Sequence, residues 1–165
     1  MIRRTFVVAA LASLSACGDD EPPPPPPPAA PPPPPAPTVV SLTLTASPGV
    51  NPNAEGQPRP VRVRVLQLAN GAAFAQADFF ALDQDLAGTL GDDLKGVDEL
   101  VLAPGAREIW QKKLDDETRV IGIMAAYQAI DAAQWRAWKE VPRNETILLT
   151  AELGAAGVVI REAAT

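Results

Sequence analysis

The sequence predicts an all-β fold: a two-sheet β-sandwich of about eight strands with a short helical insertion. Apolar and polar residues alternate over several short stretches, as they do in strands with one buried face. Clusters of Gly, Pro, Asn and Asp separate these stretches at the spacing typical of a sandwich, and the helix signals are brief. The expected strands are 39–46, 61–68, 97–102, 107–114, 119–127, 135–141, 146–153 and 157–162.

The first two expected strands alternate most clearly. In the first, valine, leucine and alanine alternate with serine and threonine; the second begins Val-Arg-Val-Arg-Val. We expect Arg62 and Arg64 of the second strand to form a solvated face. Between the strands, residues 47–60 contain four prolines, two glycines and two asparagines, which predicts a long irregular loop.

The remaining strands are predicted from local signals of different strength. Asp78 can cap a short helix, and Gly88 and Gly91 are expected to keep the next segment irregular. The pattern of 107–114 is ambiguous between helix and strand, but the turn-like stretch at 115–118 favours a hairpin of 107–114 with 119–127. We expect 119–127 to be a central strand because both of its faces are apolar. Gly-Ala-Ala-Gly at 154–157 predicts a second hairpin between the last two strands.

Residues 1–16 have the pattern of a secretory signal peptide. Arg3 and Arg4 precede an apolar run that is too short to span a bilayer, and small residues follow it. Leu14-Ser15-Ala16-Cys17 resembles the bacterial lipobox, so we expect a lipid to be attached to Cys17. The alternative is an ordinary secreted protein with a free thiol.

Residues 17–37 are expected to form a tether before a globular domain at 38–165. Within it, 22–37 is proline except for three alanines, and proline cannot form a helix or a central strand. A polyproline II segment of this length would extend for about 50 Å. We interpret it as a stiff spacer, and a ligand for a proline-recognising domain is the alternative.

Composition excludes several classes of function. The chain carries a formal net charge of −6, which argues against a nucleic-acid partner. It has no histidine and one cysteine, which removes histidine-based catalysis and cysteine-based zinc sites. We therefore expect no enzyme activity, no cofactor, no metal and no small-molecule substrate.

Three weaker candidates for a chemical site remain. Residues 83–88 imitate the start of a calcium loop, but Ala87 and Leu94 stand where oxygen ligands are required. The acidic groups at 92–93 and 115–117 are interpreted as solvated turns rather than as paired catalytic carboxylates. The three tryptophans could stack on sugar, but core or edge packing is the more common role.

The order of motifs along 38–165 resembles the outer-membrane lipoprotein of type VI secretion systems, the TssJ family. Single motifs are short, and their ordered combination carries the resemblance. Two features depart from the family pattern: the polyproline segment is long, and Tyr127-Gln128 stands where a Phe-Arg pair is expected. The motifs are Leu42–Ser47, Asn51-Pro52, Pro60–Leu68, Phe74, Ala77–Leu82, Leu90–Leu94, Asp98-Glu99, Leu102–Gly105, Gly122–Tyr127 and Trp135-Arg136.

The resemblance implies a transthyretin-like sandwich that has no catalytic role. It also implies an outer-membrane lipoprotein, anchored by its lipid and facing the periplasm, which binds the periplasmic domain of the inner-membrane component TssM. The family makes much of this contact through the loop between its first two strands, here 47–60. We expect this loop to contribute little to the core, and its contact candidates are Pro48, Gly49, Val50, Asn51, Pro52 and Asn53.

Two other functions compete with this one. A periplasmic lipoprotein that inhibits a toxin or hydrolase, as an immunity protein does, would also be an acidic, tethered sandwich. A cell-wall hydrolase is the third hypothesis, and the lack of histidine and of a paired-carboxylate motif counts against it.

Overall fold

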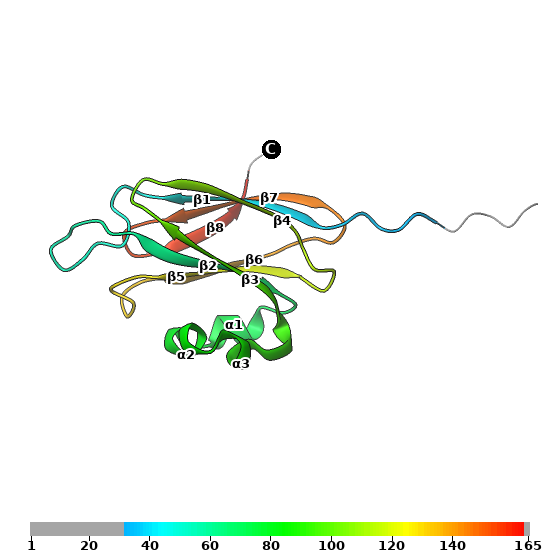
Figure 1. Cartoon of the computed structure of the whole chain (residues 1–165), viewed down its shortest axis with the longest axis horizontal. Coiled ribbons are helices and arrows are strands. Elements are labelled where there is room, and N and C mark those ends of the chain that lie inside the picture. The colour runs from blue at the N-terminus through cyan, green and yellow to red at the C-terminus, as the bar shows by residue number, and fades with distance from the viewer. Residues whose placement is uncertain (1–31, 164–165) are drawn as a thin grey trace, which may run out of the picture. The chain divides into compact units, whose positions relative to one another are not determined.

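The computed structural model describes residues 32–163 and shows two four-stranded sheets packed face to face (Figure 1). The predicted all-β sandwich is confirmed, and residues from Pro34 onward form one compact unit. The first sheet has the order β4-β1-β7-β8, and the second has the order β3-β2-β5-β6. The strands are β1 (Val39–Ala46), β2 (Val61–Leu68), β3 (Leu94–Leu102), β4 (Arg107–Lys113), β5 (Val120–Ala126), β6 (Arg136–Glu140), β7 (Thr146–Leu153) and β8 (Val158–Glu162).

Strand pairing is antiparallel with one exception. β1 lies between β4, with which it pairs antiparallel, and β7, with which it pairs parallel. The predicted hairpin of the last two strands is confirmed, because β7 and β8 pair antiparallel on either side of 154–157. The parallel pair joins the start of the domain to its last third, so the first sheet closes only when distant parts of the chain meet.

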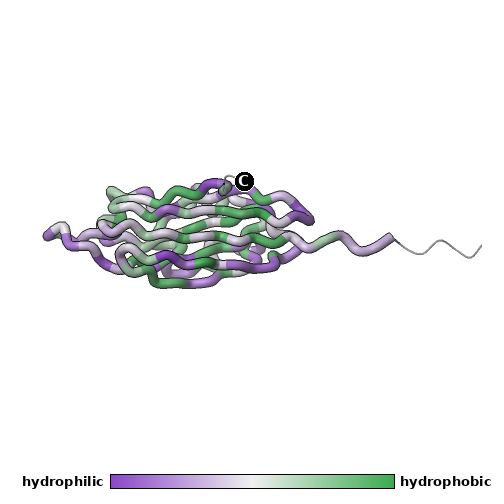
Figure 2. The backbone as a smooth tube through the Cα atoms, turned by 90° about the horizontal axis from the view of Figure 1, so that it is seen from above, coloured by the Kyte–Doolittle hydropathy of each residue, from purple (hydrophilic) through white to green (hydrophobic). Residues whose placement is uncertain are grey.

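The main core fills the space between the two sheets. Along β1, Val40, Leu42 and Leu44 are fully buried, while the residues between them are only partly buried. This period of two is the alternation that predicted the strand. Apolar residues run along the strands, and the tip of the longest loop is hydrophilic (Figure 2).

A second core lies on the outer face of the second sheet. Three short helices, α1 (Ala72–Gln76), α2 (Phe79–Gln84) and α3 (Leu86–Leu90), cover that face and lead into a 3-10 turn, η1 (Gly91–Asp93) (Figure 1). Phe74 is fully buried there and lies against Gly122, where an added Cβ would stand 3.1 Å from the phenyl ring. The glycine therefore allows α1 to approach β5 closely.

The helical insertion is larger than the sequence predicted. Asp78 caps α2 as expected, since its side chain accepts from the Phe80 and Ala81 amides. The expectation that the next segment is irregular was wrong, because the Asp85 side chain accepts from the Gly88 amide and starts α3. Gly91, with φ of +53°, then ends that helix.

The predicted hairpin of 107–114 with 119–127 was wrong. β4 pairs with β1 in the first sheet, whereas β5 lies between β2 and β6 in the second. The difference follows from burial: β4 buries only Trp110 and suits a sheet edge, while β5 buries residues on both faces and suits a covered centre. The central position expected for 119–127 is confirmed.

The arginines of β2 do not form a freely solvated face. Arg62 and Arg64 both contact the Asp83 carboxylate of α2, at 2.7 and 3.0 Å, and Arg64 also contacts Glu99 at 2.9 Å. Their side chains are 34% and 19% exposed. Arg64 holds the pKa of Glu99 below its ordinary value by donating a hydrogen bond to it. The cluster fastens α2 to the second sheet.

Candidate partner-binding surface

Four loops lie at one end of the sandwich: 47–60, 103–106, 127–135 and 154–157. Strand register brings them together, since Thr45 pairs with Arg107 and Val61 pairs with Leu102 where their strands end. The entry of the chain is at the other end, where Thr38 accepts a hydrogen bond from the Leu114 amide (Figure 1). We call the four loops together the four-loop surface.

The 47–60 loop is attached to the core by Val50. The Val50 side chain is fully buried and belongs to the cluster between the sheets. Its amide donates to the Ser47 carbonyl at 3.1 Å, and its carbonyl accepts from the Arg59 amide at 3.2 Å. The expectation that this loop contributes little to the core was therefore wrong.

Asn51 fixes the base of the same loop. It is 4% exposed and adopts the left-handed conformation, with φ of 49°, which asparagine tolerates better than most residues. Its Nδ2 donates to the Pro60 carbonyl and its Oδ1 accepts from the Gln128 amide, both at 2.8 Å. One buried amide thus closes the loop on itself and joins it to 127–135.

The exposed tip of the loop is a tight turn around Asn53 and Gln57. The Asn53 amide donates to the Gln57 carbonyl at 2.9 Å, and the Gln57 amide donates to the Asn53 Oδ1 at 2.8 Å. Gly56 supplies the positive φ that the turn requires, +76°. The hydrogen bonds of the turn shape the tip. Residues 54–60 are all exposed, so the tip is accessible.

The contact candidates named from the sequence fall into three groups. Pro48 and Gly49 are exposed, Pro52 and Asn53 are partly buried, and Val50 and Asn51 are buried. Sequence reasoning missed the exposed residues 54–60. The burial of Val50 could have been predicted from the sequence. A lone branched apolar residue in a polar loop is more typical of the core than of a solvated contact. Cys17, the signal peptide at 1–16 and most of 22–37 lie outside the described residues.

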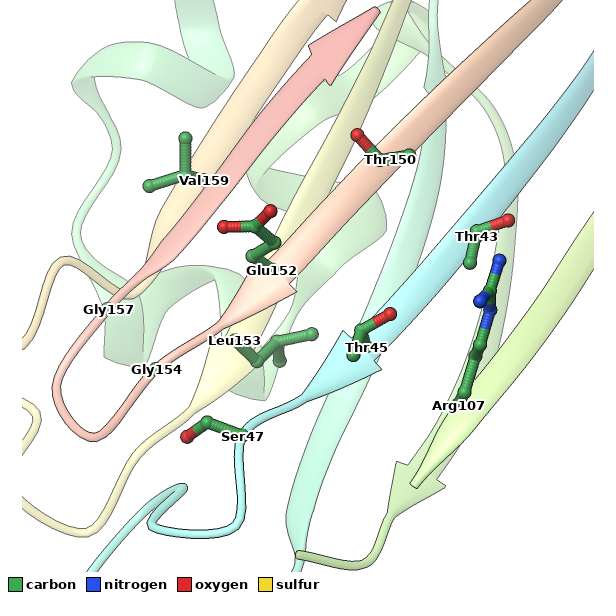
Figure 3. Close-up of a pocket in the computed structure, with 10 residues that line it drawn as sticks. All are labelled: Thr43, Thr45, Ser47, Arg107, Thr150, Glu152, Leu153, Gly154, Gly157 and Val159. Carbon is green, nitrogen blue, oxygen red and sulfur yellow. The ribbon is translucent and has the colours of Figure 1, made fainter. Parts of the chain in front are cut away.

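Tyr127 begins the 127–135 loop, and its side chain belongs to the main core. It is 5% exposed, and burial raises the pKa of its phenol to about 12, a change that the Gly157 backbone opposes. The phenol is therefore neutral at physiological pH and packs as a core residue. Beside the loops, an open hollow on the first sheet is lined by threonines of β1 and β7 together with Arg107 and Glu152 (Figure 3).

The calcium-like segment at 83–88 is used by the fold. Asp83 contacts the β2 arginines and Asp85 caps α3, so both carboxylates have partners. Within residues 32–163, no three acidic, histidine or cysteine side chains gather to hold a metal ion. In the same part of the chain, no helix has the length and apolar character needed to cross a membrane.

The two four-stranded sheets and their accessible loop end define a β-sandwich domain with a folded loop surface. A family model described as type VI secretion lipoprotein, VasD, EvfM, TssJ, VC_A0113 matches residues 38–156. The chain belongs to this family, whose members are structural lipoproteins of the type VI secretion membrane complex, and the resemblance drawn from the sequence is confirmed. The comparison with curated proteins gave no match.

Solved structures agree with the family assignment. The T6SS lipoprotein TssJ1 from Pseudomonas aeruginosa is 40% identical with a TM-score of 0.76, and the match covers 78% of this chain and 98% of that one. Serratia marcescens Lip, a membrane bound component of the type VI secretion system, is 30% identical with a TM-score of 0.71, covering 79% and 99%. A chain of a structure described as a type VI membrane complex is 25% identical with a TM-score of 0.64, covering 73% and 95%.

Proposed function

We propose that this lipoprotein links the outer membrane to the type VI secretion complex by binding the periplasmic domain of the inner-membrane component TssM through its 47–60 loop. The observation that carries the proposal is the exposed tip at 54–60, whose turn is closed by hydrogen bonds between Asn53 and Gln57. The family membership and the fold shared with a chain of a type VI membrane complex support it.

The hydrogen bonds that shape the loop before binding favour a high affinity. A flexible loop loses conformational freedom when it docks, and this loss subtracts from affinity. Here Asn51 and the Asn53–Gln57 turn hold the loop before any partner arrives. More of the contact energy then remains as binding free energy.

The anchoring is part of the same proposal. We expect a lipid on Cys17, the outer membrane as the site of attachment, and 22–37 as the spacer. The chain enters the domain at Thr38, at the end of the sandwich opposite the four-loop surface. Mass spectrometry of the mature N-terminus checks the lipid, and an unmodified cysteine would contradict it.

The binding experiment removes the tip and keeps the base of the loop. Replacing 53–57 with two glycines should leave Val50 in the core and both Asn51 hydrogen bonds in place, because neither involves the replaced residues. We expect the dissociation constant for the TssM periplasmic domain, measured by calorimetry, to rise about tenfold or more. Asp116→Ala, at an exposed turn of the other end, is the control and should bind like wild type.

Circular dichroism establishes that the shortened variant is folded. A folded variant that binds TssM as tightly as wild type would contradict the assignment of the TssM-binding site to this loop. The crystallised chain of the P. aeruginosa relative matches this domain over 98% of its length, and residues from Pro34 onward form one compact unit, so residues 34–165 are the form to purify for these measurements.

A further inference from the structure

We infer that the domain is built to carry tension along its strands, with β1 as the strand that transmits force from the tether to the loops at the opposite end. The inference rests on the proposed function, in which a membrane anchor holds one end of the domain and a protein partner holds the other. It follows from the path of the chain and from the direction in which the strands of the first sheet are paired.

The chain order places β1 directly between the tether and the 47–60 loop. The proline-rich stretch ends at Pro37, and Thr38 already belongs to the fold, because it is buried and its carbonyl accepts from the Leu114 amide at 2.9 Å. From there β1 runs to Ala46, where the loop begins. Force that enters at Thr38 therefore passes along one strand to the other end of the sandwich (Figure 1).

β1 is held on both sides along its whole length. Its eight residues are all in register with β7, and seven of them are also in register with β4. Backbone hydrogen bonds mark both ends of the strand. The Val39 amide donates to the Glu145 carbonyl at 3.0 Å, and the Ala46 amide donates to the Ala106 carbonyl at 2.9 Å. Neither end of β1 is therefore free to fray before the rest.

The parallel pairing with β7 decides how this strand responds to force. Val39 is level with Thr146 at the end where the chain enters, and Ala46 is level with Leu153 at the loop end. When Thr38 is pulled one way and the loop end the other, β1 slides against β7, and the hydrogen bonds between the two strands are strained together. The whole ladder must then break at once, because no bond at an end opens before the others.

The loop passes force to β1 without slack. The Ser47 amide donates to the Leu153 carbonyl at 2.8 Å, and the Val50 side chain is fully buried between the sheets. The two hydrogen bonds of Asn51 hold the base of the loop. A pull on the loop therefore reaches the strands of the sandwich before the loop itself unravels.

β8 responds to force in the opposite way. It is an edge strand of five residues that runs back from the loop end toward the end where the chain enters. A force between the two chain termini therefore lifts β8 from its end, and its hydrogen bonds to β7 break one after another. The same domain should resist force strongly in one direction and weakly in the other.

Single-molecule force measurements on residues 34–165 test the inference. Cys17, the one cysteine of the chain, lies outside this fragment, so each introduced cysteine is a unique attachment point. The fragment is pulled from its N-terminus and from Ala155→Cys, an exposed site at the loop end. We expect the unfolding force to be at least about twofold higher than when the same fragment is pulled from its two termini at equal speed, because β1 is then sheared against β7.

A second cysteine variant is the matched control. Asp116→Cys is an exposed site that follows β4 at the end where the chain enters, so pulling it against the N-terminus peels β4 from β1 bond by bond. We expect it to unfold at the low force seen with the two termini, and equal melting temperatures of both variants and wild type establish that the cysteines leave the fold intact.

An unfolding force for Ala155→Cys that is no higher than for the other two geometries would overturn the inference. Since no TssM is present in this experiment, that result would leave the proposed function standing. Failure of wild type to bind TssM in calorimetry would instead overturn the proposed function, and this inference with it, whatever the forces are.

Discussion

Replacing Asn51 with alanine tests how the long loop is held. The change removes two hydrogen bonds, both 2.8 Å long, each worth about 1 kcal/mol of net stability. It also forces alanine into a left-handed conformation, which costs about 1 kcal/mol more. We expect the free energy of unfolding to fall by about 3 kcal/mol in total.

A matched control separates the two contributions. Asn144 also has a positive φ, 60°, but lies at the other end of the sandwich, and its side chain makes no hydrogen bond within the described part of the chain. Asn144→Ala should therefore carry only the backbone cost, about 1 kcal/mol. The difference between the two variants, about 2 kcal/mol, measures the Asn51 amide.

Urea unfolding of residues 34–165 gives both values, and hydrogen exchange of the Gln128 amide gives an independent readout. That amide should exchange much faster in Asn51→Ala, because it loses its acceptor. Equal losses of stability in the two variants, with unchanged exchange at Gln128, would refute the role given to this side chain.

Three further outcomes are expected. Gly122→Val should lower the free energy of unfolding by about 2 kcal/mol or more, since the new side chain meets Phe74, and calorimetric melting checks this against wild type. Asp98→Asn should cost about 1 kcal/mol at pH 7 in urea unfolding, and almost nothing in strong acid. The hydrogen bond from Lys112 holds the pKa of Asp98 below its ordinary value, so its stabilisation is present above the ordinary carboxyl range and is lost as pH falls through the folded pKa. Replacing 22–33 with a Gly/Ser linker of equal length keeps Pro34–Pro37 of the compact unit and should leave the melting temperature of the domain unchanged. A sharp drop would show that the replaced segment packs on the domain.

Strands and caps could be predicted from the sequence because they depend on near neighbours. The period of two in β1 and the Asp78 cap of α2 are both local patterns, and both are confirmed. The predicted start of β3 was wrong: the strand begins at Leu94 rather than at 97. The first three residues were missed because they do not alternate between buried and exposed positions.

Sheet assignment was the part that local patterns could not supply. β4 and β5 are separated by a turn-like acidic stretch, yet they lie in different sheets. What distinguishes them is the number of covered faces, which a short strand with one tryptophan does not reveal. Val50 and Asn51 were misjudged for a related reason, since their buried positions depend on β5 and on 127–135, far away in the chain.

The parallel pairing of β1 with β7 has a consequence for how the protein is made. β1 is the first strand of the domain to be synthesised, yet Val39 pairs with Thr146, in the last third of the chain. Its other neighbour, β4, is also distant. Contacts between remote segments form slowly, because the chain must close a long loop before they stabilise anything. We expect the first sheet to assemble only after most of the domain, including β7, has been made.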